Sequence, residues 1–245
     1  MAEKHSAKSG KIRRFLKYAS IAFLLLLIFP VLHIGLTRFI NPIWSPMQSE
    51  RSLKARFSGT AWHTTPVQWV SLEKIPVELI HYIWASEDQA FFTHNGFDMW
   101  QLKQAMDAAR EGGHSIRGAS TITMQCARSV YLWQDRSYVR KALEAYYTLW
   151  MELLLSKQRI LELYLNHIEL GAGIYGVGAA AQEYYGKTPD QLSKNEMLSL
   201  AAILPNPLKW SPVHQNAMVQ RKIARIQRLA SRAPFPKEEL KSTKD

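Results

Sequence analysis

The sequence lacks several features that would identify its chemistry directly. It contains one cysteine, Cys126, so no intrachain disulfide can form. It has no Walker A loop and no nucleophile-elbow serine, and its eight histidines are not spaced as metal ligands. Residues 171–176 match a dinucleotide-binding glycine pattern, but they follow a helical segment and therefore indicate a turn. No repeat or strand pattern is present, and the sequence predicts a mainly α fold.

Charged residues are absent from Tyr18 to Leu36, a run of 19 residues. A helix of that length spans roughly 28 Å at about 1.5 Å per residue, close to one bilayer crossing. A cleaved signal peptide would need small residues after the run, whereas residues 36–42 are bulky. A buried core helix would normally carry polar residues over such a length. Six basic residues and one acidic residue precede the run, so we predict an uncleaved, single-pass anchor with a cytoplasmic N-terminus.

The formal net charge of +11 extends beyond this basic N-terminal flank. Simple solubility accounts for an excess of positive charge, and so does attraction to anionic lipid headgroups or a phosphorylated substrate. Charge alone does not decide between the two. The predicted exterior location argues against nucleic acid as a partner.

Apolar periodicity and turn signals divide the chain into five segments. Helical patterns begin at Leu72 and recur at 99–110, 140–166 with a break near Ser156, 179–185, from Ser193 to Leu204, and 217–232. The predicted segments are a basic cytoplasmic N-terminus (1–17), a transmembrane anchor (18–38), a connector with little periodicity (39–66), a helical domain (67–232) and a polar C-terminal tail (233–245).

Four ionisable residues lie among aromatic and aliphatic residues between Ser86 and Asp98, in the segment SEDQAFFTHNGFD. Buried charges are costly unless they are paired or used, so their density favours a functional site over a solvated helix end. Glu87 continues the apolar face formed by Ile80 and Ile83. A carboxylate at that position is expected to be partly desolvated, which suits a general base or general acid.

The segment GASTITMQCAR (Gly118–Arg128) contains three hydroxyl groups, an amide and a guanidinium. Ser120 or Thr121 is suited to cap a helix that runs through Arg128. Amides at a helix N-terminus, together with hydroxyls and a guanidinium, are also suited to bind a phosphate group. The two interpretations are compatible.

The segment RKALE places Arg140 and Lys141 one helical turn before Glu144. Such spacing is common in surface ion-pair ladders, but the helix that follows is too apolar for a solvated face. Glu144 is therefore the second candidate for a catalytic carboxylate. Glu152 lies about 12 Å further along the helix and rotated by about 80°, so it need not share the site.

Three segments together resemble the peptidoglycan glycosyltransferases, a lysozyme-like transglycosylase family that occurs alone or fused to penicillin-binding transpeptidases. They are SEDQAFFTHNGFD, GASTITMQCAR, and RKALEA with the downstream KQRILELYLN, and the resemblance covers roughly Leu72 to Arg228. It implies a lysozyme-like helical domain that polymerises lipid II with inversion and releases undecaprenyl diphosphate. Because no transpeptidase domain follows, the monofunctional biosynthetic enzyme is expected.

The resemblance also implies roles for individual residues. Glu87 matches the base that deprotonates the acceptor 4-hydroxyl, and Glu144 matches a second glutamate that assists departure of the lipid diphosphate through a divalent metal, Mg²⁺ or Mn²⁺. The residues assigned to substrate binding are Asp88, Phe91, His94, Gly96, Ser120, Thr121, Gln125, Arg128, Arg140 and Lys141. Two positions depart from the family pattern, Cys126 in place of leucine and Ser129 in place of asparagine, and Ser129 is expected to weaken a donor contact.

The expected partners are lipid II, the growing glycan strand, membrane lipids and other proteins of cell-wall synthesis and division. No tightly bound cofactor is expected. The runner-up interpretations are a lysozyme-like lytic transglycosylase that uses Glu87 as an acid, and a catalytically inactive, membrane-anchored scaffold. The retained glutamates at positions 87 and 144 argue against the scaffold.

Overall fold

The described part of the chain consists mainly of helices, as the sequence predicts. The computed structural model describes residues 2–58, 67–112, 120–134 and 137–241, and only the backbone at residues 2–12, 22, 23, 26 and 58. The helices are α1 (Ala2–Thr37), α2 (Pro46–Ser58), α3 (Val77–Glu87), α4 (Met99–Gly112), α5 (Ile122–Tyr131), α6 (Tyr138–Leu154), α7 (Lys157–His167), α8 (Gly176–Tyr185), α9 (Lys194–Ile203) and α10 (Ala217–Arg232). Short 3-10 turns lie at Leu72–Lys74, Pro189–Gln191 and Lys237–Leu240.

Hydroxyl side chains fix the starts of several helices at the places that the sequence predicts. Thr121 accepts a hydrogen bond from the Met124 amide at 3.2 Å and begins α5. Ser156 does the same at the start of α7, so the long apolar stretch breaks where expected. Ser193 and Glu196 form a reciprocal capping box before α9. These caps satisfy amides that have no partner within the helix.

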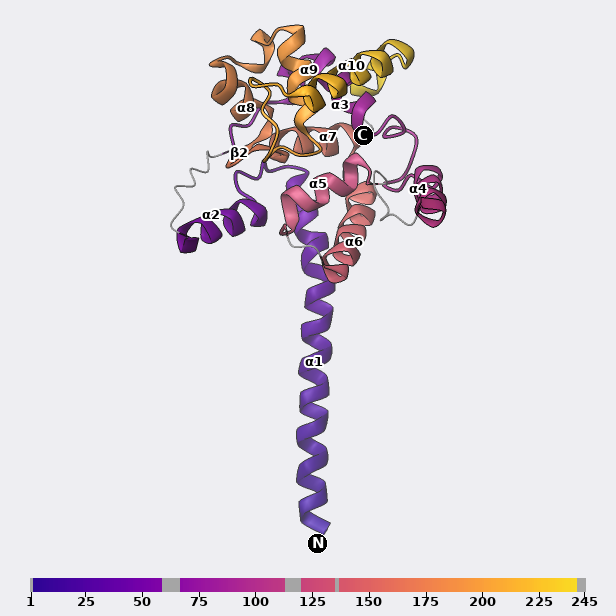
Figure 1. Cartoon of the computed structure of the whole chain (residues 1–245). Coiled ribbons are helices and arrows are strands. Elements are labelled where there is room, and N and C mark those ends of the chain that lie inside the picture. Colours follow the sequence, from indigo (N-terminus) through magenta and orange to yellow (C-terminus); the bar gives the residue numbers. More distant parts are fainter. Residues whose placement is uncertain (1, 59–66, 113–119, 135–136, 242–245) are drawn as a thin grey trace.

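Helix α5 lies at the centre of the domain. It packs against α6, α7 and α2, while α3 packs against α9 and α10 above it in Figure 1. Eight of its ten residues are buried, and the two that are not are Gln125 and Arg128. The core therefore holds α5 firmly and leaves one polar stripe of the helix facing outward.

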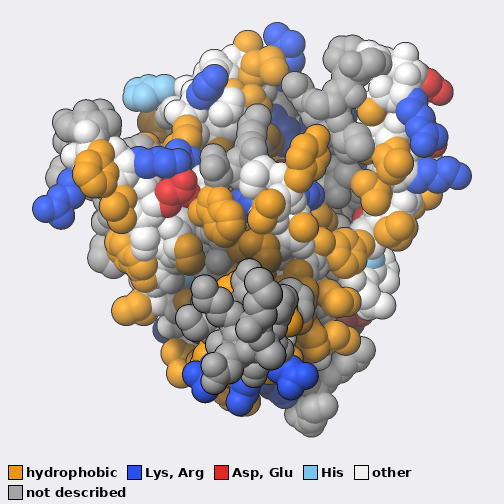
Figure 2. All heavy atoms as spheres, turned by 90° about the horizontal axis from the view of Figure 1, so that it is seen from below, with side chains coloured by type: hydrophobic (Ala, Val, Ile, Leu, Met, Phe, Trp, Pro, Cys, Tyr) orange, Lys and Arg blue, Asp and Glu red, His pale blue; other side chains and the backbone are white. Residues whose placement is uncertain are grey.

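Helix α1 projects from the domain as a long rod, and its C-terminal end is fixed to the core (Figure 1). The Thr37 hydroxyl lies 2.6 Å from the Tyr131 hydroxyl, and the Arg159 guanidinium donates to the Thr37 carbonyl at 2.8 Å. Apolar side chains are spread over the face from which α1 projects (Figure 2). Among the described residues, no helix is both long and apolar enough to cross a membrane, so the predicted anchor stays a prediction.

The predicted connector is not irregular throughout, because it contains α2. Ser45 accepts from the Gln48 amide, and the Gln48 side chain accepts from the Ser45 amide at 2.8 Å, which is a capping box with Pro46 at the first helical position. Met47 and Ala55 are buried on one side of the helix. Pro46 therefore begins a helix inside the segment predicted as a connector with little periodicity. Residues 59–66 lie outside the described part.

Two further expectations about the chain were wrong. A two-stranded antiparallel hairpin, β1 (Glu169–Gly171) and β2 (Ile174–Tyr175), follows α7, although no strand was predicted. Strands this short contain too few residues to show an alternating pattern. The segment predicted as a polar C-terminal tail also contains a buried aromatic residue, because Phe235 packs edge-on against Trp84 with ring centroids 5.4 Å apart.

Candidate active site

Glu87 is the last residue of α3, and the helix presents it next to α5. The buried residues Ile80, Ile83 and Trp84 hold α3 in the core, so the end of the helix is fixed. The Glu87 carboxylate accepts a hydrogen bond from the Ser86 hydroxyl at 3.0 Å and from the Gln125 amide nitrogen at 3.2 Å. Its side chain is 14% exposed, which confirms the expected partial burial.

Lys222 of α10 brings a cation close to Glu87, with its Nζ 3.8 Å from Oε1. Burial lowers the pKa of Lys222, and the nearby Arg225 lowers it further, while the Glu87 carboxylate opposes both effects. The sequence predicted a helix at residues 217–232 but did not indicate that Lys222 lies at the site. Only the tertiary packing of α10 against α3 reveals this contact.

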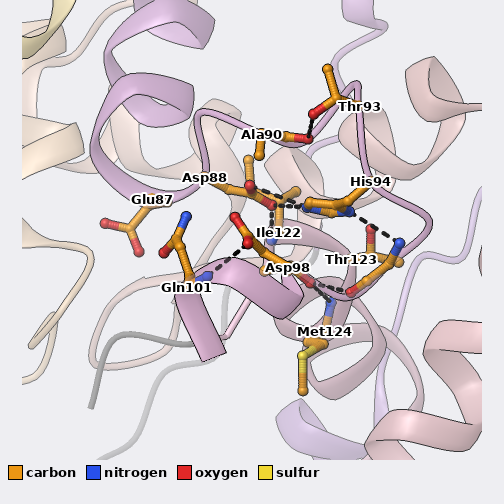
Figure 3. A network of polar contacts seen from close by, with 12 residues as sticks. Glu87, Asp88, Ala90, Thr93, His94, Asp98, Gln101, Ile122, Thr123 and Met124 are labelled. Atoms are coloured by element: carbon orange, nitrogen blue, oxygen red, sulfur yellow. Dashed lines mark hydrogen bonds and ion pairs between the residues drawn. The ribbon is translucent and has the colours of Figure 1, made fainter. Parts of the chain in front are cut away.

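A buried pair of side chains, Asp88 and His94, stabilises the loop that follows Glu87 (Figure 3). The Asp88 carboxylate lies 2.9 Å from His94 Nε2 and accepts from the Ile122 amide at 2.9 Å. His94 Nδ1 accepts from the Gly96 amide at 3.0 Å, so the Nε2 atom carries the proton that is donated to Asp88. In Figure 3 the Glu87 side chain points away from this pair.

The first turn of α5 is occupied by groups of the protein itself. The Ile122 amide binds Asp88, and the Met124 amide binds the Thr121 hydroxyl. Thr121 in turn donates to the Gly96 carbonyl at 2.7 Å. These contacts confirm Thr121 as the cap, but they take up two of the amides that were expected to bind a phosphate. The polar groups of α5 that remain toward the outside are Gln125 and Arg128.

Glu144 is buried on α6 between two cations. Arg140 Nη1 lies 2.5 Å from its Oε2, and Lys141 Nζ lies 2.6 Å from its Oε1. Lys141 also reaches the Ser120 hydroxyl at 3.4 Å, and 47% of its side chain is exposed. The predicted association of Arg140, Lys141 and Glu144 is therefore present, and it brings Ser120 to the same place.

A cleft of about 310 Å³ lies beside α5, between α2, α6 and the turn after α9. Arg51, Arg128 and Arg140 line it, together with the acidic residue Glu169. Glu169 pairs with Arg51 at 3.1 Å, yet burial raises the pKa of Glu169. The cleft is thus rich in guanidinium groups, which bind planar and tetrahedral anions well.

A second hollow of about 440 Å³ lies on the other side of Glu87. Glu87 lines this hollow together with Asp98, Trp100 and Arg225, whereas Gln125 lines the arginine-rich cleft. The hydrogen bond between Glu87 and Gln125 therefore lies where the two spaces adjoin. One carboxylate borders a sugar-sized hollow, and a cationic cleft begins next to it.

The remaining predicted residues are mostly inside the protein. Phe91 is fully buried, and Gly96 adopts φ +85°, a conformation that favours glycine. Of the two departures from the family pattern, Cys126 is buried and donates toward the Ile160 carbonyl, while Ser129 lines the arginine-rich cleft. Sequence reasoning missed Arg51 and Tyr164, which also line that cleft, because nothing in their local sequence distinguishes them.

The residues around Glu144 do not fit a divalent cation held by the protein. Arg140 and Lys141 occupy both carboxylate oxygens, and two positive charges flank one negative charge. Elsewhere in the described ranges, no group of three or more histidine, cysteine or acidic side chains could hold a metal ion.

The chain is similar to known proteins of one family. A family model described as transglycosylase matches residues 55–231. The chain is 42% identical over 234 residues to a biosynthetic peptidoglycan transglycosylase of Xanthomonas campestris pv. campestris (strain B100), covering 96% of this chain and 95% of that protein. Proteins of the same name from Caulobacter vibrioides and Aeromonas hydrophila are 40% and 41% identical, each over 88% of this chain and at least 90% of their own length.

Proposed function

Because the chain belongs to the transglycosylase family and is a glycosyltransferase of peptidoglycan biosynthesis, we propose that it joins lipid II units with Glu87 as the base. The observation that carries this proposal is the place of Glu87 between the sugar-sized hollow and the arginine-rich cleft. The product is a β-1,4-linked glycan strand, and the second product is undecaprenyl diphosphate.

The acceptor sugar occupies the hollow beside Glu87, with its 4-hydroxyl facing the carboxylate. The proton of that hydroxyl passes to Glu87 as the oxygen forms a bond to the donor anomeric carbon. The bond from that carbon to the diphosphate breaks, and its electron pair leaves with the lipid diphosphate. Attack from the face opposite to the leaving group inverts the configuration. Gln125 and Lys222 hold the carboxylate in place from two sides.

The diphosphate of the donor lies in the arginine-rich cleft, where positive groups stabilise the charge that develops as it leaves. Arg128 and Arg140 line this cleft, and Lys141 lies beside Arg140 on α6. Glu144 acts by fixing the side chains of Arg140 and Lys141 rather than by touching the substrate. The divalent metal that the family resemblance implies is tested by chelation. Polymerisation that persists in EDTA agrees with side-chain cations alone, and activity that returns only with Mg²⁺ or Mn²⁺ contradicts it.

In the same proposal, residues 18–38 hold the chain in the cytoplasmic membrane, where its lipid-linked substrate resides. The support is the uncharged sequence run and the exposure of Leu24, Leu25, Phe29 and Leu32 on α1. Such side chains lose unfavourable contact with water in a bilayer. Extraction of membranes with alkaline carbonate checks this. An anchored chain stays in the pellet, and release into the supernatant contradicts the proposal.

The reaction itself is tested by incubating the full chain with lipid II and, separately, with finished peptidoglycan. We expect glycan polymer and undecaprenyl diphosphate from the first incubation and no soluble fragments from the second. Soluble muropeptides from finished peptidoglycan, without polymer from lipid II, would support a lytic enzyme instead. Replacement of Arg128 by methionine removes one cation of the cleft while leaving Glu87 intact, and we expect it to raise the KM for lipid II.

A further inference from the structure

A second buried ion pair lies behind the loop that joins α3 to α4, residues 88–98. Glu152 of α6 and Lys157 of α7 approach to 2.8 Å, and their side chains are 8% and 18% exposed. Neither residue lines the hollow or the cleft that adjoin Glu87. Both line a separate hollow of about 350 Å³ on the other side of the loop. The mechanism described above does not use them.

Both members of the pair also form contacts beyond each other. Lys157 contacts the loop itself, and Glu152 contacts the first turn of α5, against which the loop packs. Lys157 donates to the His94 carbonyl at 2.7 Å, and its Nζ lies 4.6 Å above the centre of the Phe91 ring. Glu152 accepts from the Thr123 hydroxyl at 2.5 Å, in the first turn of α5. A Cβ on Gly96 would lie 2.9 Å from Glu152 Cγ, so the loop passes very close to this side chain.

Burying this ion pair costs desolvation free energy, and the contacts of the pair explain what the pair contributes in return. Burial lowers the pKa of Lys157, although Glu152 opposes the shift. Two apolar side chains of similar volume would be about as stable as a buried ion pair. What apolar side chains cannot supply is a directed donor for the His94 carbonyl and an acceptor for Thr123.

We propose that Lys157 and Glu152 are positioning residues. They fix residues 88–98 on the side of the loop that faces α6 and α7, and thereby hold Glu87 in its reactive orientation. Asp88 and His94 hold the front of the same loop against α5. The loop is thus held from two sides, and Glu87 immediately precedes it. This inference rests on the proposed role of Glu87 as the base.

The test compares Lys157→Met with Lys187→Met in the full-length protein. Lys187 forms an ion pair of the same length, 2.8 Å, with Glu196 and does not contact the loop. We expect Lys157→Met to lower kcat for lipid II by about 10- to 100-fold, because small misplacements of a reacting group have effects of that size. The KM should stay within about twofold, since no substrate contact is lost. Lys187→Met should leave both constants nearly unchanged.

Two further variants separate positioning from general destabilisation. The double variant Glu152→Gln with Lys157→Met leaves no unpaired buried charge, so its unfolding temperature should return toward that of the wild type while its kcat stays low. Lys157→Arg keeps the charge and the donors, and the adjoining hollow gives it room, so kcat should recover in part. A double variant with a kcat near that of the wild type overturns the proposal, and so does an Arg variant as inactive as the Met variant.

Glu87→Gln is measured alongside these variants. If it polymerises lipid II at the wild-type rate, the assignment of the base has failed. If it is inactive and Lys157→Met retains a wild-type kcat, only the positioning role has failed.

Discussion

Replacing Asp88 with asparagine tests how the loop after Glu87 is held. The carboxylate faces two donors, His94 Nε2 at 2.9 Å and the Ile122 amide at 2.9 Å, and it is almost wholly buried. If the imidazole changed its tautomer, it would lose the hydrogen bond that the Gly96 amide donates to His94 Nδ1. Asparagine supplies one acceptor and two donors in place of two acceptors, so its amide nitrogen has no suitable partner among the groups that Asp88 binds.

The expected cost follows from these contacts. Two charge-assisted hydrogen bonds become neutral or are lost, and one buried donor is left unsatisfied, which together amount to about 3–5 kcal/mol. In a chain of this size each kcal/mol lowers Tm by about 2–4 °C, so we expect a decrease of about 6–20 °C. Activity on lipid II should fall as well, because the loop beside Glu87 loosens.

The assay is thermal unfolding followed by circular dichroism, with Asp98→Asn as the matched control. Asp98 accepts from the Gln101 amide at 2.8 Å at the start of α4, a position where asparagine caps as well as aspartate. The control should therefore unfold at a temperature close to that of the wild type. If Asp88→Asn also unfolds within about 1 kcal/mol of the wild type, the buried pair does not stabilise the loop as described.

Three further predictions concern other parts of the structure. Gly96→Ala should unfold at a much lower temperature and lose activity, because its Cβ would lie 2.7 Å from Thr148 Cγ2 at a φ of +85°; wild-type thermal unfolding would contradict this. Tyr164→Phe removes the 3.1 Å hydrogen bond to the Gln125 side chain, so we expect a loss of about 1 kcal/mol and a lower kcat in steady-state assays, and an unchanged kcat would show that Tyr164 does not orient Gln125. Burial lowers the pKa of His167 from 6.5 to about 4, so below pH 6.5 the unfolded chain binds a proton that the folded chain does not. Stability should therefore fall by about 3 kcal/mol between pH 6.5 and 4, and urea unfolding of His167→Asn should show a shallower decline.

The sequence predicted the helices whose ends carry local signals. Residues 217–232 form α10 as expected, Ser193 begins a helix where its spacing from Glu196 indicates a capping box, and the long helical stretch breaks at Ser156. Helix α2 was missed because Pro46 is both a common turn residue and a common first residue of a helix. The β1–β2 hairpin was missed because its strands are too short for a periodic signal.

The site was predictable where its residues lie close together in sequence. Arg140, Lys141 and Glu144 are neighbours on one helix, so their spacing alone indicated their association. Lys222 is 135 positions from Glu87, and its contact depends on the packing of α10 against α3. The phosphate site expected at the start of α5 was not predicted correctly, although its residues lie close together in sequence. A helix start suits any anion, and here the anion is Asp88.

The central claim is that Glu87 takes the proton of the acceptor hydroxyl, and the kcat of Glu87→Gln on lipid II tests it most directly. Glutamine keeps the size and an acceptor oxygen but cannot take up a proton. Glu78→Gln, an exposed position on the same helix, is the matched control. We expect kcat to fall by about 10²- to 10⁴-fold at position 87 and to stay unchanged at position 78. A Glu87→Gln enzyme that polymerises lipid II within about threefold of the wild-type rate would contradict it.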